Sequence, residues 1–222
     1  RFFRLFPPPR FLEMPAAGLD ISDRSIRFAM LKRGMDGFVL KTFGEETLPP
    51  GIVVGGIIQK HNEIRGVLQN MGRKYALSLV RTSLPEEQGY SLKINIPQVK
   101  PEEIYESLEL QLTDHVPLSP QEAVFDYQIV TCGTRENKEV YKVGLSVMPQ
   151  KIVESYLKIF EGTGLTPLSF EFEAHSIARA IVRRGVCGTF LLLDIGATRT
   201  GIAVQSEGII TFTSTINVGG NS

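Results

Sequence analysis

The sequence is poor in the residues that build redox and metal centres. It holds no tryptophan, three histidines and two cysteines among 222 residues. Cys132 and Cys187 form no CxxC pair, and no histidine stands at metal-ligand spacing from another histidine or from a cysteine. These absences exclude a zinc ribbon and a CxxC redox motif. We expect the two cysteines to be reduced thiols rather than a disulfide.

An excess of charge of one sign is also lacking. Lysine plus arginine number 24 and aspartate plus glutamate number 24, so the net charge is zero with neutral histidines. This balance does not favour nucleic acid or an anionic membrane as a partner. With 42% hydrophobic and 22% charged residues, the composition is that of a globular protein with one large or two small domains.

Long apolar runs are absent as well. No run reaches the ~20 residues that a membrane-spanning helix needs, and no secretory signal peptide is recognisable. The longest apolar stretch, residues 51–58, is interrupted by Gly55 and Gly56. We expect it to pack in the core or in a loop, with a peptide-binding groove as the alternative.

Two segments of the chain read as the same loop. In residues 18–28 and again in 192–204, an apolar strand ends in Asp, a tight turn follows, and a second apolar strand begins. Such a turn directs several backbone N–H groups to one point, which can hold phosphate oxygens, and the adjacent Asp can hold a hydrated Mg²⁺. Two copies predict two half-domains across a nucleotide cleft. The alternative is that Asp20 and Asp194 only cap a strand turn.

Helical and strand periods alternate along the chain, which predicts an α/β protein. Helices are expected to begin near 60, 101, 149 and 174, the first of them stopping at Gly72. The middle of the chain follows the order strand, helix, strand, strand, interrupted by prolines. The expected strands are 25–31, 38–43, 76–82, 90–96, 123–131, 139–147, 168–172, 189–193, 200–205 and 209–216. The last two have an apolar face with few residues left to cover it, which predicts open apolar surface.

Five landmarks in order carry a resemblance to a known family. They are Leu48-Pro49-Pro50-Gly51 with Val54-Gly55-Gly56; residues 103–127 with His115-Val116-Pro117-Leu118 and Val124-Phe125-Asp126-Tyr127; residues 155–174 with Gly164-Leu165-Thr166-Pro167; Asp194-Ile195-Gly196-Ala197-Thr198; and Gly219-Gly220. From about residue 16 to 222 the chain resembles the N-terminal portion of the PilM family of type IV pilus assembly proteins. It is more distantly similar to the division protein FtsA of the same SHS2-containing superfamily.

The resemblance implies an actin/Hsp70-like (ribonuclease H-like) α/β fold. Its subdomain IA is broken by an inserted strand–helix–strand–strand subdomain, and the start of the second half follows. The implied parts are an N-terminal arm at 1–15, subdomain IA at 16–83 and 149–187, the SHS2-type insertion at 84–148, and the truncated second half at 188–222. The arm, with its Phe and Arg residues, is expected to be loosely docked, or else to act as a surface anchor.

The resemblance also implies that ATP and Mg²⁺ bind between the two halves of the intact protein. The implied phosphate loops are Asp20, Ser22, Asp23, Arg24 and Ser25, and Asp194, Gly196, Ala197, Thr198, Arg199 and Thr200, with Asp20 and Asp194 on the metal. Solvated arginines and ordinary turn threonines are the alternatives for these loops. Ser22 stands where the family has glycine, whose freedom at positive φ it lacks. We expect no measurable ATP affinity in this chain by itself, and no residue is assigned to catalysis or hydrolysis.

The function that the resemblance implies is scaffolding. Members of the family hold the N-terminal tail of PilN, an inner-membrane protein, from the cytoplasmic face, in a groove that involves subdomain IA and the insertion. We therefore expect a cytoplasmic adaptor, peripheral to the inner membrane, with no nucleic-acid partner and with self-association left open. The alternatives are an FtsA-like division protein and an actin-fold ATPase or kinase. The acidic helix with Glu102, Glu103 and Glu106 is expected to be a solvated face, or else to receive a basic partner.

Overall fold

The structure, a computed structural model, describes residues 14–35, 37–130, 140–183 and 185–220. The chain divides into two compact units. The first comprises Arg1–Val54, Ile58–Ser83 and Leu157–Phe170, and the second comprises Gly55–Ile57, Leu84–Tyr156 and Glu171–Ser222. The four-part division expected from the sequence differs from this one and stays a prediction, although both place a boundary between Ser83 and Leu84. The expected arm lies outside the described residues except for Met14 and Pro15.

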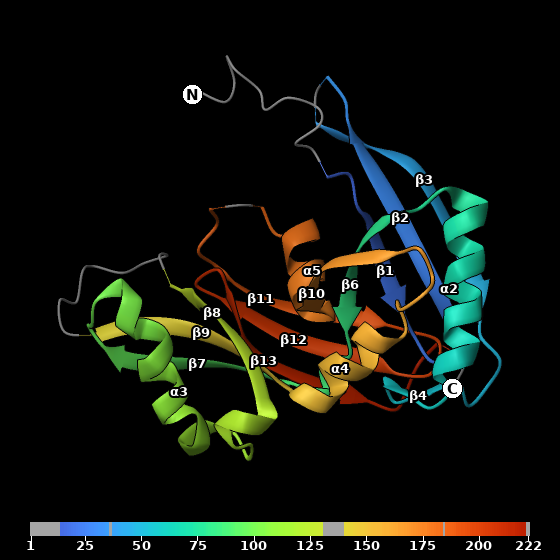
Figure 1. Cartoon of the computed structure of the whole chain (residues 1–222). Helices are drawn as coiled ribbons and strands as arrows, with labels where there is room; N and C mark the ends of the chain where they lie inside the picture. The colour runs from blue at the N-terminus through green and yellow to red at the C-terminus, as the bar shows by residue number, and fades with distance from the viewer. Residues whose placement is uncertain (1–13, 36, 131–139, 184, 221–222) are drawn as a thin grey trace. The chain divides into compact units, whose positions relative to one another are not determined.

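The first unit is built on a five-stranded sheet with the order β10-β6-β1-β2-β3 (Figure 1). β1 pairs with β2 in antiparallel fashion and with β6 in parallel. The strands are β1 (Ala17–Ile21), β2 (Ser25–Arg33), β3 (Phe38–Thr47), β6 (Leu79–Leu84) and β10 (Thr166–Phe172). Helix α2 (His61–Tyr75) covers the face that carries Phe28, whose ring lies 4.7 Å from that of Tyr75. The apolar period of α2 buries Ile64, Leu68 and Met71.

The second unit contains the strand–helix–strand–strand order that the sequence predicts. These elements are β7 (Tyr90–Pro97), α3 (Ile104–His115), β8 (Ala123–Ile129) and β9 (Val140–Pro149), with 3-10 turns at η2 (Glu86–Gln88), η3 (Pro101–Glu103) and η4 (Pro120–Glu122). The strands form an antiparallel sheet with the order β7-β9-β8. Buried residues of α3, such as Leu108 and Leu112, pack against Val143 and Leu145 of β9.

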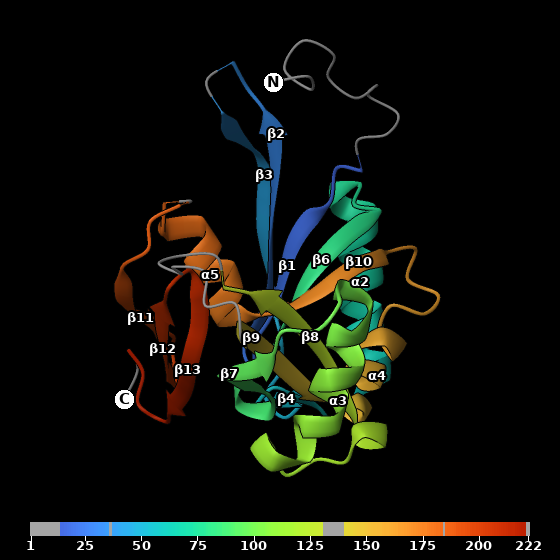
Figure 2. The same cartoon turned by 90° about the vertical axis from the view of Figure 1, so that its left-hand side faces the viewer.

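The second unit also holds an antiparallel sheet of β11 (Thr189–Ile195), β12 (Thr200–Ser206) and β13 (Ile209–Ile216) (Figure 2). Helix α5 (Glu173–Ile181) covers one face of it, where Ala178 packs with Leu192 and Ala203. Directly paired residues share a face, so Leu191, Val204 and Phe212 lie on the other. That face exposes Leu191, Leu193, Ile195, Phe212 and Ile216. The expectation of open apolar surface is confirmed.

The remaining elements are β4 (Val53–Val54), β5 (Ile57–Ile58) and α4 (Gln150–Lys158). For residues 51–58, the sequence leaves open whether they pack in the core or line a peptide-binding groove. Ile52 and Val53 are 1% exposed and belong to the core, whereas Val54 is 53% exposed. Half of this stretch is therefore buried, and Val54 and Ile57 keep exposed side chains.

Two expectations are wrong. Helix α2 does not stop at Gly72 but runs to Tyr75, and Ala76 ends it in the left-handed conformation at φ 51°. Gly72 lies inside the helix, where a Cβ would lie 3.3 Å from the Leu165 side chain. Cys187 is disulfide-bonded, contrary to the expectation of reduced thiols, since composition does not reveal which residues a fold brings together. Cys132 lies outside the described residues.

Candidate functional site

The first predicted phosphate loop is a hairpin turn between β1 and β2. Asp20 pairs with Arg27 and Ile21 with Ile26 across the strands. The Ser22 N–H then donates to the Ser25 carbonyl at 2.9 Å and closes the turn. Asp23 is half-buried within it, and Arg24 is exposed at its tip. The loop therefore lies where the sequence predicts it.

The Ser22 side chain occupies the inside of this turn. Its hydroxyl donates to the Ser25 carbonyl at 3.0 Å and accepts from the Ser25 N–H at 3.2 Å. The Arg24 N–H also points to it, at the longer distance of 3.4 Å. Side-chain oxygens of serine often take backbone N–H groups in this way. The N–H groups of Ser22, Arg24 and Ser25, which a phosphate in this turn could use, are thus already hydrogen-bonded within the chain.

Asp20 is positioned by the neighbouring strand β6. Its Oδ1 accepts a hydrogen bond from the Ser83 hydroxyl at 3.2 Å. The parallel pairing of β1 with β6, in which Leu19 lies opposite Thr82, places Ser83 beside this carboxylate. Asp20 is half-buried, and its carboxylate oxygens are ligands of the kind that Mg²⁺ prefers.

The second predicted loop repeats the geometry of the first. Asp194 pairs with Gly201 and Ile195 with Thr200, the same offsets as in the first turn. The Gly196 N–H donates to the Arg199 carbonyl at 2.9 Å, as Ser22 does to Ser25. Asp194 and Ala197 are exposed, and Thr198 is half-buried. The two segments are therefore one turn built twice, each within its own unit.

The second turn is held by the segment that follows β13. The Gly220 N–H donates to the Gly196 carbonyl at 2.9 Å, and the Thr200 hydroxyl donates to the Val218 carbonyl at 2.7 Å. Gly219 lies against the turn so closely that a Cβ there would be 2.6 Å from the backbone nitrogens of Thr198 and Arg199. Only glycine fits this approach, which explains the Gly219-Gly220 landmark.

Arg199 is engaged by an acidic partner from η2. Its Nη1 lies 2.6 Å from Oε1 of Glu87, and the two side chains are only 18% and 20% exposed. A charged pair that is largely removed from water is costly to separate, because either charge alone would lose its partner and its hydration. The guanidinium predicted to contact phosphate therefore contacts a carboxylate in this structure.

No local sequence pattern indicates the roles of Glu87 and Ser83 or the hydroxyl bonds of Ser22. Glu87 lies in a run of charged residues before β7 and reads as solvated. Its pairing arises from the packing of η2 in the second unit, which no local pattern reports. The close approach of Gly219 did have a signal, since paired glycines after an apolar strand often mark close backbone contact.

No group of three or more His, Cys, Asp or Glu side chains that could hold a metal gathers within residues 14–35, 37–130, 140–183 and 185–220. A Mg²⁺ at Asp20 or Asp194 would therefore take its further ligands from water and phosphate. Among the helices in the described part of the chain, none is long and apolar enough to cross a membrane.

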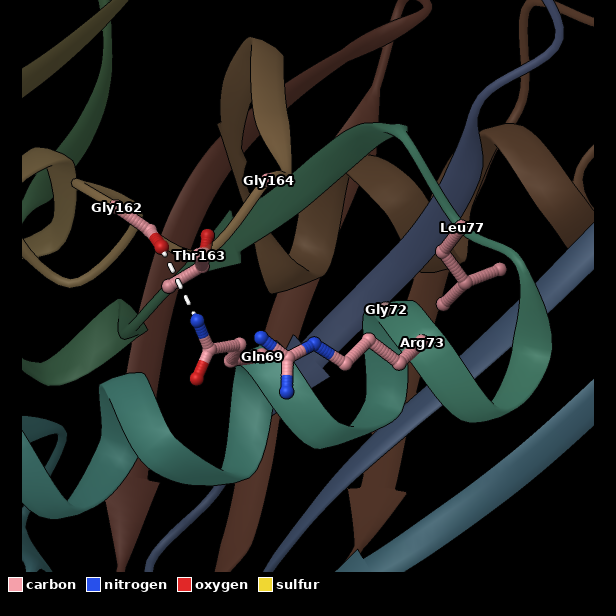
Figure 3. A pocket seen from close by; sticks show the side chains of 7 residues that line it. All are labelled: Gln69, Gly72, Arg73, Leu77, Gly162, Thr163 and Gly164. Atoms are coloured by element: carbon pink, nitrogen blue, oxygen red, sulfur yellow. Dashed lines mark hydrogen bonds between the residues drawn. The ribbon is translucent and has the colours of Figure 1, made fainter.

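A pocket of about 390 Å³ lies in the first unit, apart from the first turn (Figure 3). It lies between the last turns of α2 and the loop before β10, and the Gln69 amide donates to the Gly162 carbonyl across it at 3.4 Å. Its lining residues are Gln69, Gly72, Arg73, Leu77, Gly162, Thr163 and Gly164. The lining holds one cation and no carboxylate or imidazole, so it offers no acid–base pair.

The mixed five-stranded sheet, the inserted three-stranded sheet and the repeated Asp turn define an actin-like α/β protein. The chain belongs to the family of the type IV pilus assembly protein PilM, which matches residues 18–222. The expected fold and family are thus confirmed.

Solved structures share the fold. A PilM–PilN type IV pilus biogenesis complex is similar at 20% identity with a TM-score of 0.80, over 93% of this chain and 62% of that chain. The cytoplasmic domain of EpsL, an inner-membrane component of the type II secretion system of Vibrio cholerae, has 11% identity and a TM-score of 0.56, over 90% and 70%. The ethanolamine utilization protein EutJ of Carboxydothermus hydrogenoformans has 17% identity and a TM-score of 0.54, over 96% of this chain and 54% of that chain. The chain thus spans about three-fifths of the PilM length.

Proposed function

We propose that this chain is the N-terminal part of a cytoplasmic adaptor, peripheral to the inner membrane, in a type IV pilus assembly platform. The partner of this adaptor is the N-terminal tail of a PilN-like inner-membrane protein. The observation that carries the proposal is the family match over residues 18–222. The similarity in fold to a PilM–PilN complex over 93% of the chain supports the choice of partner.

ATP and Mg²⁺ in the intact protein form the second part of the proposal. Its support is the turn that recurs with one register and one closing hydrogen bond, at Ser22–Ser25 and at Gly196–Arg199. Asp20 and Asp194 would each bind a hydrated Mg²⁺ through carboxylate oxygens. Bound nucleotide would act by ordering the protein for its partner, and no residue is assigned to hydrolysis.

The adaptor role is tested by isothermal titration of the 222-residue chain with a synthetic peptide of a PilN N-terminal tail. A scrambled peptide of the same composition is the matched control. Saturable binding of the tail peptide, with none of the scrambled one, supports the adaptor. Failure to bind the tail, together with binding to a tubulin-like division protein, would overturn the proposal in favour of the FtsA-like alternative.

A further inference from the structure

Each of the two turns holds a group of its own chain where an anion would bind. We propose that the Ser22 hydroxyl in the first turn and the Glu87 carboxylate at the second are internal competitors of phosphate. Phosphate binding at each turn then requires that the group at that turn be displaced. The inference rests on the proposed nucleotide role and adds to it the residues that set the affinity.

In the first turn the competition is for backbone N–H groups. A phosphate held by a turn needs several N–H groups that point to one place. Here the Ser22 oxygen accepts from Ser25 at 3.2 Å and from Arg24 at 3.4 Å. Its own proton goes to the Ser25 carbonyl, so the hydroxyl is tied to the turn at both its donor and its acceptor side. Glycine at this position would leave no such oxygen.

In the second turn the competition is for the guanidinium of Arg199. Arginine binds carboxylate and phosphate through the same fork of N–H donors. The position that corresponds to Ser22 is Gly196, which has no side chain to fill the turn. Glu87 supplies the anion instead, at 2.6 Å from Nη1. In both turns, a group of the chain itself therefore occupies the donors that an anion would use, although the residues differ.

Displacement of Glu87 has a structural consequence in the second unit. Glu87 belongs to η2, and its neighbour Glu86 accepts a hydrogen bond from the backbone N–H of Ala174 at the start of α5. The chain leads from η2 directly into β7 of the inserted sheet. An anion that binds Arg199 in place of Glu87 would therefore release a contact of η2, the segment that precedes β7 of the inserted sheet.

The test is a two-dimensional ¹H–¹⁵N NMR titration of the full 222-residue chain with pyrophosphate and Mg²⁺, a probe whose weak binding still shifts amide signals. The variants are Ser22→Ala and Glu87→Gln. The matched controls are Ser169→Ala in the first unit, whose hydroxyl accepts from Arg81, and Glu207→Gln in the second, whose carboxylate pairs with Lys93 and Lys142. A further variant adds Arg199→Gln to Glu87→Gln.

We expect each of the two variants to bind pyrophosphate about tenfold more tightly than the wild type, the effect of freeing donors to a charged ligand. The shifts should fall on the amides of their own turn. The two controls should match the wild type, and Arg199→Gln should abolish the gain of Glu87→Gln. Equal affinity in all proteins overturns the inference and leaves the nucleotide role standing. Absence of binding in every protein also overturns the inference. The nucleotide role, which is proposed for the intact protein, and the adaptor role, which the tail peptide tests, are judged separately.

Discussion

The carboxylate of Glu86 accepts a hydrogen bond from the backbone N–H of Ala174 at 3.0 Å. Ala174 lies in the first turn of α5, where N–H groups lack helical partners and the helix dipole favours negative charge. Glu86 is nevertheless only 7% exposed. Its burial outweighs the bond from Ala174 and raises the pKa of the Glu86 carboxyl to about 7. The folded chain therefore binds a proton here near neutral pH.

This raised pKa predicts a dependence of stability on pH. Between the ordinary carboxyl pKa of 4.5 and about 7, the folded state binds more protons than the unfolded one, so the free energy of unfolding falls as pH rises. Above pH 7 the Glu86 carboxyl is ionised in both states, and the folded state bears the full cost of burying that charge. We expect Glu86→Gln to raise the free energy of unfolding by about 3 kcal/mol at pH 8 and by less than about 1 kcal/mol at pH 5.

Urea unfolding at the two pH values measures this effect. Glu106→Gln, on the exposed side of α3, is the matched control and should show the same free energy of unfolding as the wild type at both pH values. The buried-charge account is wrong if Glu86→Gln is no more stable than the wild type at pH 8.

Two glycines of the first unit predict opposite effects of the same substitution. A Cβ on Gly44 in β3 would lie 2.6 Å from the Phe28 ring and 2.9 Å from the Tyr75 ring. Gly66 lies inside α2 with no atom within 4 Å of its Cβ position. We expect Gly44→Ala to destabilise the protein by about 1–3 kcal/mol through overpacking, and Gly66→Ala to stabilise it by up to about 1 kcal/mol through helix propensity. Thermal unfolding of the pair measures both, and a stable Gly44→Ala variant contradicts the packing described here.

The repeated turn shows what could be predicted from the sequence. Asp20 and Asp194 end apolar strands, and small or polar residues follow each, so the position of both hairpins was visible locally. The hydrogen bonds that the side chains form inside the turns could not be predicted from the sequence. The Ser22 hydroxyl has several ways to hydrogen-bond to a nearby backbone, and the choice depends on the closed geometry of the turn. The pairing of Arg199 with Glu87 depends on packing between segments far apart in the sequence.

Helix ends and burial show the same limit. Gly72 was a reasonable stop for α2 because glycine often follows the last helical turn. The helix continues through Gly72 to Tyr75 instead, and Ala76 takes the left-handed position. Glu86 reads as a surface residue by type, yet α5 covers it. Local patterns located the elements, whereas contacts between elements decided these details.

The acidic residues of η3 and the first turn of α3 offer a test of partner specificity. Glu102 and Glu106 are exposed, and carboxylates in water contribute little to binding unless a partner charge meets them at close range. We expect Glu102→Lys with Glu106→Lys to change the affinity for a PilN tail peptide by less than about twofold, measured by isothermal titration at 150 mM salt. Glu109→Lys, on a half-buried neighbour, serves as the comparison. A tenfold loss in the double variant would assign this helix face to a basic segment of the partner.

The uncovered face of the β11-β12-β13 sheet predicts self-association of this chain. On this face Leu191, Leu193 and Phe212 are 64%, 56% and 52% exposed, and large exposed apolar surfaces mark sites of association. We expect Leu191→Thr with Leu193→Thr to lower the fraction of dimer in sedimentation velocity and to reduce binding of a hydrophobic dye, because threonine keeps the strand propensity while adding a hydroxyl. Leu192→Thr, on the face under α5, should instead destabilise the fold by about 2–4 kcal/mol. Unchanged sedimentation of the double variant would show that this face does not mediate association.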